Sequence, residues 1–307
     1  MFFRNLTLFR FPKAVAAELE ALPKRLKKHA FRPCGPLEMQ TRGWISPFGR
    51  GESELTHQIG AFTLLALGGE DKLLPSAVVN EAVAGKIEAL EAQRGKRIGG
   101  RERKRLKDEA MHELMPKAFS RPFRQAAYLD AKEGWLVVDS ASRKSAEGFL
   151  TVLRETLGTF PALPLDPEES PRALMTGWLT GAKVPEGFEF GDECELKDPV
   201  DGGAQVRCRR QALDADEVRE HLRGGKQVSQ LGLVIDGRVS FVLGDDLSVK
   251  KLKFLDVVVE ELEDTDRESP RAELDARFAL MSLTLKPVLA KLDEVFRLPR
   301  PSERGKR

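Results

Sequence analysis

Basic side chains at four places of this 307-residue chain are candidates for binding nucleic acid. Clustered lysine and arginine are what binding to a phosphate backbone requires. Three of the places are short, and the fourth is the run 94–107, in which eight basic residues and one acidic residue give a local balance of +7. The residues we expect to contact nucleic acid are Arg207, Arg209, Arg210 and Gln211, then Lys226, then Lys250, Lys251 and Lys253, and in the run Arg97, Arg101 and Lys104.

Each basic group also has a plainer interpretation. Charges on an edge strand prevent aggregation, and the run 94–107 also fits a solvated helix face or a contact with a partner subunit. The net charge is only +2, and the segment 260–275 holds eight acidic and two basic residues, a balance of −6. The distribution of charge therefore indicates nucleic acid, whereas the total does not.

Residue patterns that would support a reaction are missing from the sequence. His29, His57, His112 and His221 do not stand at zinc-ligand spacing with one another or with a cysteine. There is no P-loop, dinucleotide fingerprint or nucleophile elbow. Asp245-Asp246 follows a glycine between two strand patterns, which indicates a turn and not a metal site. We expect no enzyme activity, cofactor or metal, and three scattered cysteines favour a reducing compartment.

Hydrophobic periodicity predicts an α+β fold with mostly antiparallel sheets, packed helices and an inserted helical arm. The long helix at the C-terminal end is interrupted at Pro287 in this interpretation. Prolines between 161 and 171 suggest a boundary, so the predicted domains are 1–75 with 116–165, the arm 76–115, and 166–307. The expected strands are 2–11, 61–67 with a turn at 68–71, 124–130, 135–139, 188–196, 204–210, 228–235, 238–243 and 248–259; the expected helices are 76–93, 101–114, 142–157, 172–180 and 272–296.

Two phenylalanines after the arm predict an interface. Phe119 and Phe123 lie in PKAFSRPFR, between prolines and beside Lys117. This composition indicates an exposed or interface loop, although packing of the rings in the core also fits. We expect Phe119, Phe123 and Lys117 to contribute to a dimer interface.

Several stretches, in order, resemble the RdgC family of bacterial recombination-associated proteins. They are FFRNLTLFRF, FRPCG, GWISPFG, LTHQIG, KLLPSAVVNEAV, LKDEAMHELMPKAFSR and VVDSAS in the first half, and ECELKD, GGAQVR, GDDLSVKKLKF and DTDRES in the second. The resemblance implies a ring-shaped homodimer that binds DNA, mainly double-stranded, with little sequence preference. It also implies restraint of the RecA recombinase, a role at replication forks, and a cytoplasmic, nucleoid-associated protein without a membrane partner.

Two other functions stay open at this point. A metal-dependent nuclease would need a carboxylate cluster that binds magnesium. A protein-interaction module would act on the RecA recombinase directly, without needing free DNA.

Overall fold

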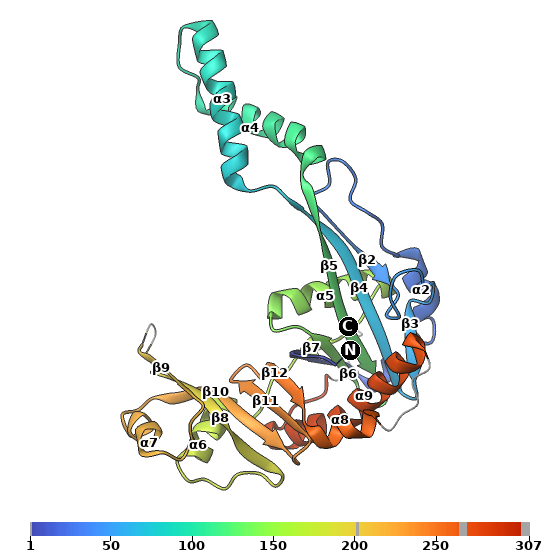
Figure 1. The fold of residues 1–307 in the computed structure, drawn as a ribbon, viewed down its shortest axis with the longest axis vertical. Helices are drawn as coiled ribbons and strands as arrows, with labels where there is room; N and C mark the ends of the chain where they lie inside the picture. Colours follow the sequence, from blue (N-terminus) through green and yellow to red (C-terminus); the bar gives the residue numbers. More distant parts are fainter. Residues whose placement is uncertain (1, 201–202, 264–268, 302–307) are drawn as a thin grey trace.

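One long sheet of mostly antiparallel strands runs through the molecule, and helices pack against it (Figure 1). The computed structural model describes residues 2–200, 203–263 and 269–301. The expected α+β class is confirmed. Neighbouring strands follow the order β2-β4-β5-β6-β1-β12-β11-β10-β8-β9, while β3 pairs with β4 and β7 pairs with β1.

The strands and helices have these bounds in the described part of the chain. The strands are β1 Leu6–Arg10, β2 Gln40–Ile45, β3 Thr56–Ile59, β4 Phe62–Leu73, β5 Phe119–Asp130, β6 Trp135–Asp139, β7 Leu163–Pro164, β8 Phe188–Lys197, β9 Gln205–Arg209, β10 Gln227–Ile235, β11 Val239–Gly244 and β12 Val249–Phe254. The helices are α1 Ala16–Leu19, α2 Leu22–Lys28, α3 Ser76–Arg94, α4 Gly100–Leu114, α5 Arg143–Leu157, α6 Pro171–Leu179, α7 Asp216–Arg223, α8 Asp256–Glu263 and α9 Pro270–Phe296, with short 3-10 turns η1 Lys13–Val15 and η2 Met115–Lys117.

The first half of the sheet is buried on both faces, which explains its continuous apolar runs. Successive strand residues point to opposite faces. Leu64 therefore joins a core with Phe278 of α9, whereas its neighbour Leu65 joins a second core with Phe149 of α5. Helices thus cover both sides of β4, β5 and β6.

The second half of the sheet packs helices on one face. Met175 of α6 and Val218 of α7 share a core with Leu196 and Leu231 of the sheet. The two halves are joined in one sheet through β1 and β12, with Leu6 opposite Val249. The division into domains at 161–171 stays a prediction.

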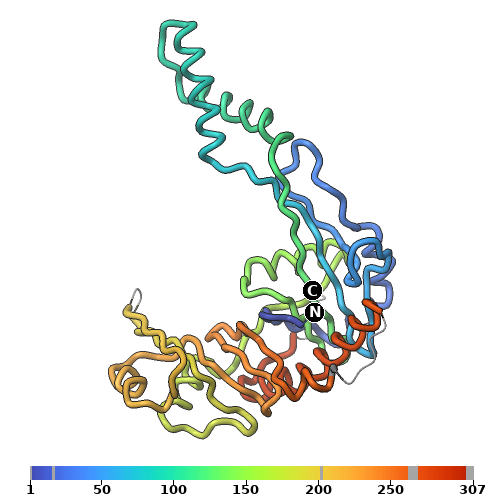
Figure 2. The backbone as a smooth tube through the Cα atoms, in the orientation of Figure 1, coloured from blue at the N-terminus to red at the C-terminus, as the bar shows by residue number. Residues whose placement is uncertain are grey.

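Helices α3 and α4 form an arm that extends from the ends of β4 and β5 (Figures 1 and 2). Few apolar side chains, among them Leu106 and Ala110, are buried between the helices. Ion pairs add contacts along their exposed sides: Lys86–Glu113 and Arg94–Glu102, each 2.7 Å long. The predicted helices of the arm are confirmed.

The predicted turn at 68–71 is wrong, because β4 continues through Gly68 and Gly69 to Leu73. Gly69 allows a close approach of two backbones, and Gly68 leaves room for a side chain of β2. A Cβ atom on Gly69 would lie 2.4 Å from the carbonyl oxygen of Thr41 on β2, and one on Gly68 would lie 2.5 Å from Ile45. Glycine in a strand thus marks crowding here and not a change of direction.

Other boundaries differ more modestly from the expectation. The long helix α9 includes Pro287 without interruption. The expected strand 248–259 ends at Phe254, and helix α8 follows it. Asp236 and Gly237 form the turn between the expected strands 228–235 and 238–243, and both have the positive φ angles, 50° and 62°, that a two-residue hairpin turn requires. Residues 201–202, in the connection between the expected strands 188–196 and 204–210, lie outside the described residues.

We expect Gly69→Ala to destabilise the protein by about 1–3 kcal/mol, because β2 and β4 must move apart to admit the methyl group. Gly85→Ala is the matched control: Gly85 lies inside α3, and a Cβ atom there meets nothing within 4 Å. Removing that helical glycine should stabilise by about 0.5–1 kcal/mol. Urea unfolding of the three proteins measures both changes. Equal stability of Gly69→Ala and the parent would show that crowding does not require glycine at this position.

Candidate nucleic-acid interface

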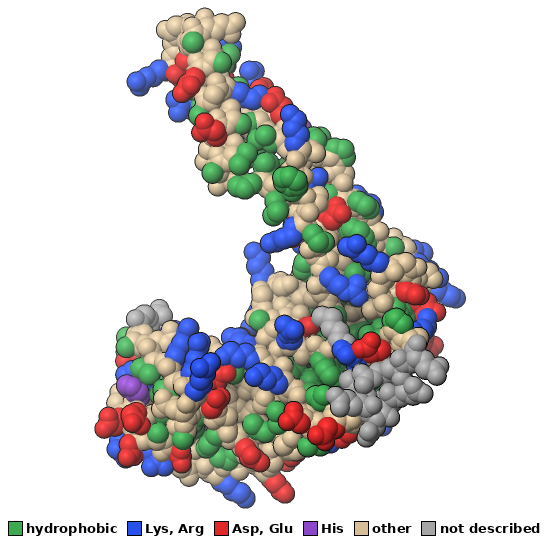
Figure 3. Space-filling model, in the orientation of Figure 1, with side chains coloured by type: hydrophobic (Ala, Val, Ile, Leu, Met, Phe, Trp, Pro, Cys, Tyr) green, Lys and Arg blue, Asp and Glu red, His purple; other side chains and the backbone are tan. Residues whose placement is uncertain are grey.

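Lysine and arginine side chains gather beside the open side of the molecule. The arm and the second half of the sheet extend from the centre and leave a space between them (Figure 1). In the same view, Figure 3 shows basic side chains along the edge of the lower body that faces this space. Strands β9 and β12 reach that edge.

Strand β9 presents two arginines on the face of the sheet that the helices leave uncovered. Arg207 and Arg209 are exposed, whereas Cys208 between them is buried in the core beneath α6 and α7. The expected alternation is therefore confirmed. Arg210 follows with a φ of 56°, in the left-handed region that ends the strand, and Gln211 is half-buried. Within the described residues, Arg209 and Arg210 form no ion pair.

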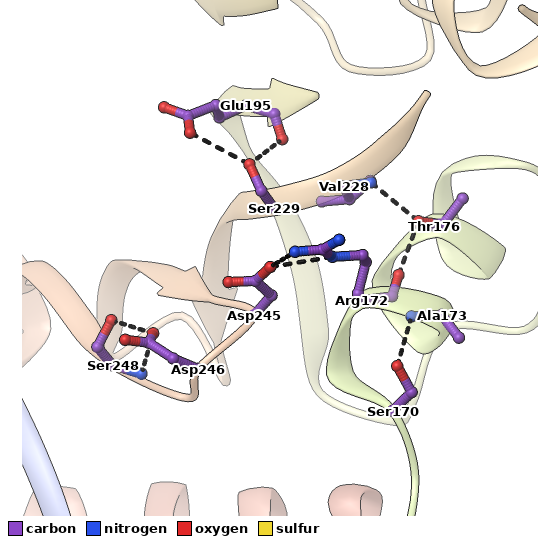
Figure 4. A network of polar contacts seen from close by, with 10 residues as sticks. All are labelled: Ser170, Arg172, Ala173, Thr176, Glu195, Val228, Ser229, Asp245, Asp246 and Ser248. Carbon is purple, nitrogen blue, oxygen red and sulfur yellow. Dashed lines mark hydrogen bonds and ion pairs between the residues drawn. The ribbon is translucent and has the colours of Figure 1, made fainter. Parts of the chain in front are cut away.

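A buried carboxylate holds Arg207 in place. Glu195 lies directly opposite Arg207, on β8, and accepts a hydrogen bond of 2.7 Å from its Nε. The hydroxyl of Ser229 on β10 donates to the same carboxylate at 3.2 Å, as Figure 4 shows. Sequence reasoning missed Glu195, although pairing the alternating residues of two adjacent strands would have placed it opposite an arginine.

A bulge in β12 exposes three lysines together. Lys250 faces Val242 and Lys253 faces Ser240, so β12 has one residue more than β11 in this interval. Lys251 is the extra residue of the bulge, and its φ angle is 54°. Because the bulge shifts the alternation by one, Leu252 returns to the core while the lysines remain on the outer side. Lys250 is half-buried, and Lys251 and Lys253 are exposed.

Polar contacts fix the turn that precedes these lysines (Figure 4). Arg172 of α6 donates two hydrogen bonds to the carboxylate of Asp245, one of them from Nε at 3.0 Å. The neighbouring Asp246 accepts from the backbone N–H of Ser248 at 3.0 Å. The interpretation of Asp245-Asp246 as a turn is therefore confirmed, and both carboxylates already have protein partners.

Three of the predicted side chains meet at one shallow hollow of about 140 Å³. Arg207, Arg209 and Lys251 line it together with Glu193 and Glu195. Lys251 forms an ion pair with Glu193, so two cations of the hollow are partly neutralised and Arg209 is not. Lys226 lies apart, half-buried before β10.

The predicted cations of the arm stand far from the hollow. Arg97, Arg101 and Lys104 are exposed at the outer end of α3 and α4, and in the described part of the chain they form no ion pair. Their neighbours are paired with acids of the same arm: Arg94 with Glu102, Arg103 with Glu91 and Arg105 with Glu109.

Phe119 and Phe123 belong to strand β5 and not to the predicted loop. Phe119 is the first residue of β5 and lies opposite Leu73, because the ladder of β4 and β5 continues to the base of the arm. Its side chain is 83% exposed, so the alternative of core packing is wrong for Phe119. Phe123 is half-buried and packs against the hydrophobic core beneath the guanidinium of Arg42, 4.3 Å from the ring centroid, so the alternative of core packing is confirmed for Phe123. Lys117 is exposed. Their part in an interface stays a prediction.

Across the three described ranges, no group of three or more His, Cys, Asp or Glu side chains is arranged to hold a metal ion. Among the same residues, no helix combines the length and the apolar character needed to cross a membrane.

Known proteins are similar to this chain along nearly its whole length. A family model described as "Putative exonuclease, RdgC" matches residues 1–298. Proteins named Recombination-associated protein RdgC are similar throughout. The one from Xanthomonas axonopodis pv. citri is 50% identical over 299 residues, covering 97% of this chain and 99% of the relative. The one from Stenotrophomonas maltophilia is 49% identical over 299 residues, with the same coverage. The chain therefore belongs to the RdgC family.

Proposed function

We propose that this protein binds duplex DNA without sequence preference, as a homodimer that closes into a ring, and thereby restrains recombination by the RecA recombinase. The observation that supports the proposal most is the uncovered face of β9 and β12, with its arginines and lysines beside the open side of the molecule. The relatives are named for recombination, which fits a DNA-binding role.

The side chains on this face suit phosphate and not base edges. Lysine and arginine that extend from strands supply charge along a backbone, and phosphate contacts carry no sequence information. Arg209, Arg210, Lys250 and Lys253 have no ion pair in the described residues, so binding them to phosphate breaks no existing contact. Together with Arg207 and Lys251, about six cations are available to a duplex.

A ring reconciles this face with the low net charge of +2. Two copies can enclose a space if the base of each arm contacts its partner. The exposed Phe119 beside Leu73, which is 47% exposed, supports this arrangement because an apolar pair of this size gains from being covered. The basic faces would then line the opening, and the protein would be found with the nucleoid and act at forks by occupying DNA.

Salt dependence of binding tests the electrostatic part of the proposal. If about six phosphates are neutralised, the logarithm of the binding constant should fall with the logarithm of salt concentration at a slope of roughly −5. Gel-shift titrations at several salt concentrations, with two unrelated duplexes of equal length, measure the slope and the sequence preference together. A slope near zero, or strong preference for one duplex, would contradict the proposal.

Two further assays separate this function from its alternatives. End-labelled duplex incubated with the protein and magnesium should stay intact, and divalent-dependent shortening would favour the exonuclease named in the family description. RecA-driven strand exchange should be inhibited by the parent but not by a variant that has lost DNA binding. Inhibition that survives in such a variant would favour direct contact with the recombinase.

A further inference from the structure

We propose that Cys194 and Cys208 are a redox-active pair that a peroxide closes into a cross-strand disulfide, which fastens the edge strand β9 to β8. The inference concerns the chemistry of the two thiols and does not depend on DNA binding. Both cysteines are free in the structure.

The register of the two strands places the cysteines at disulfide distance. Cys194 of β8 lies directly opposite Cys208 of β9. The backbone N–H of Asp198 donates to the carbonyl oxygen of Ala204 at 3.0 Å, which marks these two residues as a hydrogen-bonded pair of the β8–β9 ladder. Such pairs recur at every second position of an antiparallel ladder, so Cys194 and Cys208 also form one. Their Cα atoms are then about 5.5 Å apart, within the range of disulfides. Directly opposite Cβ atoms are about 4.5–5.5 Å apart, so the short edge strand β9 must move by about 1 Å to bring them to the 3.5–4.5 Å of a disulfide.

The side chains point the same way and contact each other. Both lie on the core face of the sheet, with 4% and 8% of their surfaces exposed. Burial, and then the charge and hydrogen bonding of Cys208 beside it, raise the pKa of the Cys194 thiol to about 12. Because a thiolate is the reactive form, the closed sheet protects the pair at neutral pH.

Opening of the edge strand gives an oxidant access. In the described residues β9 is only five residues long and pairs with β8 alone, and such edges open most readily. The Cys208 thiolate then attacks hydrogen peroxide, forming a sulfenic acid and, after protonation of the leaving hydroxide, one water. The sulfur of Cys194 displaces the second oxygen as water and forms the S–S bond. Two thiols and one peroxide thus give one disulfide and two waters.

The disulfide prevents the opening that allowed it to form. It links β9 to β8 across a short loop, which reduces the freedom of the unfolded chain. Arg207 and Arg209 flank Cys208 and are held on their face of the sheet while the bond is present. A reductant restores the two thiols and the original edge.

Peptide mapping tests the inference directly. The folded protein is treated with hydrogen peroxide, its remaining thiols are blocked, and it is cleaved after lysine, which separates the cysteines into peptides 184–197 and 198–226. We expect these two peptides to be joined, with a mass lower by two hydrogen atoms, and to separate with dithiothreitol. Cys34→Ser should leave the link unchanged, and Cys208→Ser should abolish it.

Thermal unfolding gives a second measurement that needs no variant. The oxidised parent should melt about 5 °C or more above the reduced parent, because the bond closes a loop in the unfolded chain. Consumption of the thiols without the joined peptide would overturn the inference, as would a link through Cys34 or one between two separate chains. An unchanged melting temperature with the link present would overturn the fastening of β9.

Discussion

Replacing Arg209 and Arg210 together with alanine is expected to weaken binding to duplex DNA roughly 30-fold at low salt without unfolding the protein. Neither side chain has an ion pair in the described residues, so neither is needed to balance a charge of the fold. A typical hydrogen bond contributes about 1 kcal/mol net, and two lost contacts of this size give the expected factor. The salt slope should become less steep by about 2, since each phosphate contact contributes about 1.

Arg219→Ala with Arg223→Ala is the matched control for this pair. These arginines lie on α7, which packs against the opposite face of the same sheet. The control removes the same charge and should change affinity little. Arg207→Ala is a poor substitute, because it leaves the carboxylate of Glu195 buried without its arginine partner. Fluorescence anisotropy and thermal melting measure affinity and stability. Equal affinity of both double variants at equal stability would remove Arg209 and Arg210 from the DNA face.

The regular parts of the fold could be predicted because their local signals agree with their packing. The expected helix 142–157 is α5: Ser142 accepts a hydrogen bond from the N–H of Ser145 at its start, and the helix ends before Gly158. The turn at Asp236 and Gly237 follows from its residues alone. The continuous strand β4 could not be predicted in this way, because the reason for Gly69 lies in the backbone of Thr41 on another strand.

The sequence predicted which basic residues form the candidate site, but it did not predict their contacts with residues of neighbouring strands. Alternation placed Arg207 and Arg209 on one side, since that property is local to a strand. The bulge at Lys251, which exposes three lysines together, depends on a mismatch between β11 and β12 that one strand cannot reveal. The ion pairs of Arg207 and Lys251 with Glu195 and Glu193 depend on register in the same way.

Phe119→Ser is expected to open the proposed ring without separating the dimer. An apolar side chain 83% exposed at the start of β5 is the kind of aromatic anchor that dominates the energy of interfaces. Its truncation should cost about 2 kcal/mol or more of association free energy, which shifts the closure of the ring by a factor of about 30. If a second contact holds the two copies elsewhere, the variant stays dimeric and DNA can enter and leave from the side.

Circular DNA distinguishes an open ring from a closed one. A closed ring on a circle cannot slide off, whereas on linear DNA it leaves at the ends, so the parent should resist a salt wash on circles only. Phe119→Ser should lose that retention while sedimenting as a dimer, and Leu283→Ser, which removes a 59% exposed leucine from α9, should keep it. A variant that melts far below the parent would indicate that Phe119 stabilises the fold. A Phe119→Ser variant that stays folded and is retained on circular DNA as the parent is would show that Phe119 does not close the protein ring and that another contact does.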